Sequence, residues 1–99
     1  MQQEIEELLS ADAPTLARME DTLTEGYARA LALEAERWRL ERRIGEVARE
    51  GRTDIADELK SLGTRLTHAD GELAKLRSLL GTLHERARAA RLATSRAAS

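Results

Sequence analysis

The 99-residue chain has no cysteine and no phenylalanine, and it contains one tryptophan, Trp38, one tyrosine, Tyr27, and one proline, Pro14. The absence of cysteine excludes disulfides and thiol chemistry. A β-sheet needs many more aromatic and β-branched residues, so their scarcity predicts an all-α fold. Ala, Leu and Arg, with 17, 16 and 14 residues, supply the strong helix formers that such a fold requires.

Long apolar runs are also lacking. No segment approaches the roughly 20 apolar residues of a membrane span, and the start, MQQEIEELLSADAP, lacks the basic and apolar regions of a signal peptide. We therefore expect a cytoplasmic protein with no membrane partner, and the excess of Arg over Lys, 14 to 2, indicates a bacterial source. The net charge of −2 is unevenly distributed, because residues 1–50 carry 12 acidic and 7 basic side chains and residues 51–99 carry 6 and 9. Halves of opposite charge favour two segments that lie side by side.

Two stripes with alternating spacings of three and four residues run through the chain. The first is Leu16, Met19, Leu23, Gly26, Ala30, Leu33, Arg37, Leu40, Ile44 and Val47, which Gly26 and Arg37 interrupt. The second is wholly apolar: Ile55, Leu59, Leu62, Leu66, Ala69, Leu73, Leu76, Leu80, Leu83, Ala87 and Ala90. Heptad series sustained over this length are typical of coiled coils.

Helix-capping residues give the expected boundaries. Asp12 precedes Pro14 and suits the N-cap of a first long helix, and Gly51 suits its C-cap after residue 50. Thr53 or Asp54 would cap the second helix. A connection of three or four residues forces long helices to return antiparallel, so the sequence predicts a long antiparallel helical hairpin.

The expected domain organisation has three parts. Residues 1–11 form an acidic arm or short helix, which either folds over the end of the hairpin or stays detachable for a partner. Residues 12–94 form the coiled-coil hairpin with its turn near 50–53, and residues 95–99 form a disordered tail.

Charges along the flanks test the antiparallel alignment. With Val47 near Ile55, the facing pairs on one flank are opposite in sign: Arg43–Glu58, Glu36–Arg65 and Arg29–Glu72. The other flank depends on the alignment, which gives either Glu20–His84, Tyr27–Arg77 and Glu34–Asp70 or, after a small shift, Glu20–Arg77 and Tyr27–Asp70. Arg37 either pairs with Glu34 or Glu41 on its own helix or selects the alignment as a polar core residue.

A second face of the first helix carries Ala17, Thr24, Ala28, Leu31, Ala35 and Trp38, and Tyr27 borders it. An exposed apolar stripe indicates an association surface, and aromatic residues are favoured anchors. We therefore predict an interface of Tyr27, Ala28, Leu31, Ala35 and Trp38, through which two copies form a four-helix bundle. The alternatives are a different partner protein, or a Trp38 side chain that lies along its own hairpin.

Residues able to support chemistry are sparse. No serine has a histidine three or four residues away, so we expect no enzymatic activity. His68 and His84 lie too far apart on one helix to share a metal, so we expect no bound metal or cofactor. Arg86, Arg88, Arg91 and Arg96 could contact phosphates, but an acidic chain without interleaved aromatic residues makes nucleic acid an improbable partner.

Two family comparisons arise from these residues. The length and hairpin resemble small WXG-type secreted proteins, but the turn reads Glu50-Gly51-Arg52-Thr53 and has no Trp-x-Gly. The second helix resembles an actinobacterial coiled-coil anti-sigma family that binds cyclic di-GMP through Glu-x3-Ser-x2-Arg-x3-Gln-x3-Asp. The matching positions here are Asp70, Ala74, Arg77, Gly81 and Glu85. That resemblance implies a ligand site of Asp70, Arg77 and Glu85.

Together these features predict a non-enzymatic helical-hairpin interaction module, regulatory or scaffolding, that acts through homodimerisation and binding of a partner protein. The alternative is a small coiled-coil transcription regulator of the anti-sigma kind that binds a sigma factor, a cyclic dinucleotide or both.

Overall fold

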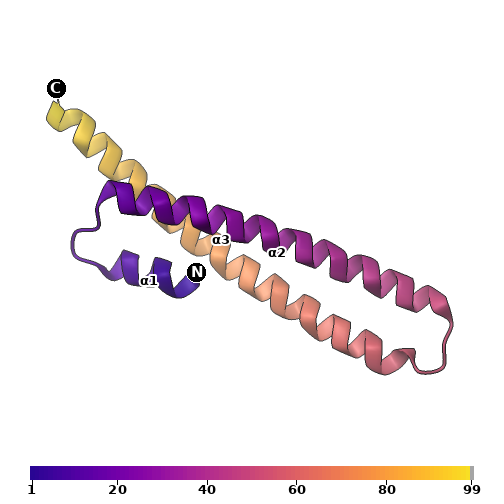
Figure 1. The fold of residues 1–99 in the computed structure, drawn as a ribbon. Helices are drawn as coiled ribbons and strands as arrows, with labels where there is room; N and C mark the ends of the chain where they lie inside the picture. Colours follow the sequence, from indigo (N-terminus) through magenta and orange to yellow (C-terminus); the bar gives the residue numbers. More distant parts are fainter. Residues whose placement is uncertain (99) are drawn as a thin grey trace. The chain divides into compact units, whose positions relative to one another are not determined.

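The computed structural model describes residues 1–98 and is all-helical over that range. Its three helices are α1 (Gln2–Ser10), α2 (Leu16–Glu50) and α3 (Ile55–Ala98) (Figure 1). The all-α prediction is therefore confirmed. None of the helices in the described range is long and apolar enough to cross a membrane.

Helix α2 begins three residues later than expected. The backbone N–H of Arg18 donates to the Thr15 hydroxyl at 3.2 Å, so Thr15 is the N-cap and the prediction of Asp12 is wrong. Thr15 stands directly before the first helical residue, where its side chain can reach the third free amide of the helix. Pro14, just outside the helix, has no amide proton that would need a partner.

The other helix ends follow glycine and acidic residues. Helix α2 ends at Glu50, and Gly51 adopts a φ of 67°, a left-handed conformation that costs glycine little. Helix α3 begins directly after Asp54, with Asp57 and Glu58 in its first turn, where negative charge favours the helix dipole.

The expected disordered tail is not found over most of its length. Helix α3 continues through Ala98, because residues 93–98 consist mainly of Ala and other residues compatible with a helix, with no Gly or Pro to end it. Ser99 lies outside the described residues.

The chain divides into two compact units, where the sequence predicts one hairpin over 12–94. Unit 1 comprises residues 1–30 and the described residues from 75 onward, and unit 2 comprises Leu31–Ala74. The divisions fall inside α2 and α3, so both helices contribute residues to each unit.

The core of unit 2 joins the two predicted stripes. One cluster of buried residues in this core consists of Leu40 and Val47 of α2 and Leu62 and Ala69 of α3. Half-buried apolar side chains pack against them: Ile44, Ile55, Leu59 and Leu66. The predicted charge pair between Arg43 and Glu58 is confirmed at 3.0 Å.

Unit 1 contains buried side chains from all three helices: Ile5, Leu8, Met19, Leu23, Ala30, Leu76, Leu80, Leu83 and Ala87. Gly26 is also buried, and a Cβ atom added there would overlap Leu80 Cδ2 and lie 3.7 Å from Ile5 Cδ1. The sequence suggested that Gly26 interrupts the apolar stripe. In the structure it is part of the core and permits close packing of the helices.

Glu20 binds Arg91, with 3.1 Å between Glu20 Oε1 and Arg91 Nε, whereas the sequence predicted His84 or Arg77 as its partner. The long guanidinium side chain of Arg91 can reach Glu20 from further along α3.

Candidate functional site

Large apolar side chains are exposed on the part of α2 that belongs to unit 2. Leu31 is 67% exposed and Trp38 is 59% exposed, and the small residue Ala35 between them is also exposed. Their spacing of four and three residues places them on one face of a helix. Leu33 and Leu40, which are 1% and 4% exposed, point to the core instead. This part of α2 thus has two apolar faces, of which one is covered within the unit.

A charged neighbour lies over the ring of Trp38. The guanidinium of Arg42 lies over the Trp38 ring, 5.4 Å from its centroid, and Arg42 Nε also contacts Glu46 Oε1 at 3.3 Å. A cation over the indole face favours one ring position and covers only part of the apolar surface. The Trp38 side chain remains more than half exposed.

The other two predicted interface residues lie on α2 within unit 1. Tyr27 is 47% exposed, and Ala28 is exposed as well. All five residues of the predicted interface are therefore accessible.

Arg37 makes one contact that the sequence suggested and one that it did not. Its Nε lies 3.2 Å from Glu41 Oε1 on its own helix and 2.8 Å from Asp70 Oδ1 on α3. Both side chains of the Arg37–Asp70 pair are nearly half exposed, so the pair aligns the helices more than it stabilises them. The predicted like-charge pair of Glu34 and Asp70 could have indicated this contact, because it called for a nearby cation.

An ion-pair network surrounds the connection between α2 and α3. Arg52 donates a hydrogen bond to Glu58, and its Nε lies 2.8 Å from Glu50 Oε2. Hydrogen bonds from Arg52 and then Arg43 hold the pKa of Glu58 below its ordinary value. The same contacts with Glu58 raise the pKa of both arginines. All of these groups are open to solvent, so the network is a surface feature of the connection.

The three predicted ligand residues, Asp70, Arg77 and Glu85, are exposed on α3. Asp70 already binds Arg37, and Glu85 Oε2 lies 3.9 Å from Arg88 Nη1, with both side chains about two-thirds exposed. Arg77 is exposed. Among the described residues no group of three or more potential metal ligands occurs.

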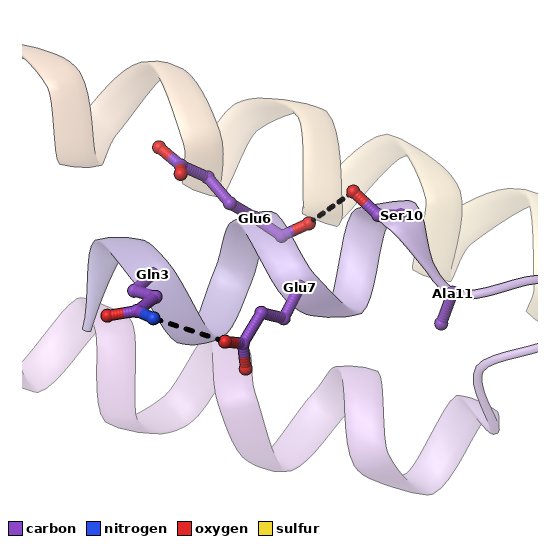
Figure 2. A pocket seen from close by; sticks show the side chains of 5 residues that line it. All are labelled: Gln3, Glu6, Glu7, Ser10 and Ala11. Atoms are coloured by element: carbon purple, nitrogen blue, oxygen red, sulfur yellow. Dashed lines mark hydrogen bonds between the residues drawn. The ribbon is translucent and has the colours of Figure 1, made fainter.

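Two shallow depressions lie elsewhere on the surface. One, in unit 2, is lined by Glu36, Arg39, Leu40, Arg43, Leu62 and Arg65. The other is on α1, lined by Gln3, Glu6, Glu7, Ser10 and Ala11 (Figure 2). Figure 2 shows that the polar groups of α1 bond to one another, with the Gln3 amide donating to Glu7 at 3.3 Å and the Ser10 hydroxyl to the Glu6 carbonyl at 2.9 Å. Neither depression contains Asp70, Arg77 or Glu85.

Comparison of the chain with models of protein families, with curated proteins and with solved structures finds no match.

Proposed function

We propose that this protein is a non-enzymatic interaction module, regulatory or scaffolding in role, whose α2 and α3 form a long antiparallel hairpin. Two copies associate through the exposed face of α2 into a four-helix bundle, and the assembly binds a partner protein. The observation that carries the proposal is the exposure of Leu31 and Trp38 on a helix whose core face is already buried. Apolar side chains of this size on one face favour association.

A second copy suits this face because its anchors are separated by a small residue. Ala35 lies between Leu31 and Trp38, so the backbone of another helix can approach while the two large side chains pack on either side of it. A two-fold dimer uses the same face of both copies, and each anchor then contributes twice. The Arg42 side chain over Trp38 reduces the number of ring positions that dimerisation must order.

The experiment is sedimentation equilibrium on the wild type and on the double variant Leu31→Glu/Trp38→Glu. We expect a dimeric wild type and a monomeric double variant, because truncation of an anchor typically costs about 2 kcal/mol, which corresponds to roughly 30-fold in Kd. Placing carboxylates in an apolar interface adds to that cost. Circular dichroism checks that the double variant stays helical.

Leu92→Glu is the matched control. Leu92 is 49% exposed on α3, so the same change of a large apolar side chain to a carboxylate is made on a different helix from the proposed face. This control should remain dimeric. If the wild type is monomeric, the homodimer is refuted, and a different protein becomes the expected partner of this face. If the double variant is still a tight dimer, the interface lies elsewhere.

A further inference from the structure

Among the described residues, helix α1 is the shortest helix, and it has few stabilising residues at its ends. It spans Gln2–Ser10, its N-cap residue Met1 makes no side-chain capping bond, and no basic side chain occupies its last turn. Residues 11–15 join it to α2 without helical structure. Isolated helices of this length are unstable in water, so α1 is helical because it packs on its neighbours.

Apolar and polar contacts join α1 to the rest of unit 1. Ile5 and Leu8 are its buried side chains, with 0% and 4% exposure, and Ile5 Cδ1 lies near Gly26. Two polar contacts come from α3. Lys75 Nζ lies 3.3 Å from Glu6 Oε1, and the Arg86 guanidinium donates to the Leu9 carbonyl.

We propose that the surface beneath α1 is a binding site for an acidic amphipathic helix of a partner protein, and that α1 is its intramolecular competitor. This surface is defined by Gly26 of α2 and by Leu80, Lys75 and Arg86 of α3. It shares no residue with the Leu31–Trp38 face, so the inference does not depend on the proposed dimer.

The chemistry of the site specifies the partner. Ile5 and Leu8 show that the surface accepts two apolar side chains three residues apart, and the tip of the Ile5 side chain lies near Gly26. Lys75 and Arg86 place cations beside this apolar surface, where they favour a helix with carboxylates and disfavour a basic one. A short helix with few buried side chains is also the element of unit 1 that opens most readily.

The test uses the full chain with Ile5→Asp and Leu8→Asp, which releases α1 and leaves Gly26, Leu80, Lys75 and Arg86 intact. The probe is a synthetic peptide of residues 1–12, titrated calorimetrically into the released variant and into the wild type. We expect binding to the released variant and at least tenfold weaker binding to the wild type, since tethered α1 competes at a local concentration on the order of millimolar. A peptide carrying the same two Asp substitutions should bind neither protein.

Charge reversal at a lysine tests the acidic preference. In the released variant, Lys75→Glu should lower the affinity for the peptide by a few-fold. Lys60→Glu, the same change at an exposed lysine of unit 2, should leave that affinity unchanged. Equal effects of the two substitutions would refute the role of Lys75. No peptide binding to a released variant that remains helical by circular dichroism would refute the site.

Hydrogen exchange on the wild type keeps the test independent of the released variant. Amides of residues 6–10 should exchange at least tenfold faster than those of residues 76–83. Equal protection would show that α1 opens only when the protein unfolds, and would overturn the proposal. The proposal would also be overturned if the released variant formed a smaller oligomer than the wild type. That result would mean that α1 of one copy packs on another copy and is not an intramolecular competitor.

Discussion

Replacement of Gly26 by alanine tests the close packing of unit 1 most directly. In the interior of a helix, alanine is favoured over glycine by about 1 kcal/mol. At Gly26 the added methyl group would overlap Leu80 Cδ2 and lie 3.4 Å from Leu80 Cγ. Leu80 is 2% exposed, so its side chain has little room to turn away. Overpacking of a filled core typically costs about 1–3 kcal/mol, which should equal or exceed the gain in helix propensity.

Gly81→Ala is the matched control for Gly26→Ala. Gly81 is exposed on α3 in the same unit, and a Cβ atom there meets nothing within 4 Å. The control should therefore gain about 1 kcal/mol from propensity alone. Because the propensity gain is common to both variants, their free energies of unfolding should differ by the packing cost, about 1–3 kcal/mol.

Urea denaturation followed by circular dichroism, at one fixed protein concentration, measures the difference. With an m-value of about 1–2 kcal/mol/M for a chain of this size, the two midpoints should lie roughly 1 M apart, with Gly26→Ala at the lower concentration. If Gly26→Ala is as stabilising as Gly81→Ala, then α2 does not approach Leu80 closely and the account of the core is wrong.

Three further predictions concern charges. Arg37→Glu and Asp70→Arg should each lower the free energy of unfolding by up to about 1 kcal/mol and the double swap should restore part of it; additive effects in a double-mutant cycle would deny the contact. The Glu58 pKa is lowered in the folded protein, so its contribution is present above the ordinary value of 4.5 and is lost as the pH falls through the folded pKa. Glu58→Gln should therefore reduce the loss of stability on acidification below about pH 4.5, and an unchanged pH profile would contradict the assignment. Calorimetry with cyclic dinucleotides should show no heat with either the wild type or Arg77→Ala, because Asp70 is engaged by Arg37; heat abolished by Arg77→Ala would instead support the anti-sigma alternative.

The sequence predicts most of the helical structure because the signals for it are local. Gly51 ends α2 through its left-handed backbone, and the heptad spacing selects residues such as Leu33 and Leu83 for the core. The Arg43–Glu58 pair follows from the alignment that the short connection imposes.

Other features depend on three-dimensional packing that spacing alone does not encode. The choice of Thr15 over Asp12 as N-cap depends on which hydroxyl or carboxylate reaches a free amide, since both residue types suit that position. The role of Gly26 requires the position of Leu80 on another helix. For Arg37 the sequence leaves open a pair with Glu34 or Glu41 and a role in selecting the alignment. Its contact with Asp70 could not be predicted, because a long side chain can reach across in more than one alignment of the helices.

The position of Trp38 also gives the protein a natural fluorescent reporter on this face of α2. It is the only tryptophan of the chain, and it is 59% exposed beneath the Arg42 guanidinium. All indole emission therefore originates at one point on α2, and its wavelength depends on how much water surrounds that ring. A molecule that covers this face would shift the emission to shorter wavelength, so that occupancy can be followed on unlabelled protein.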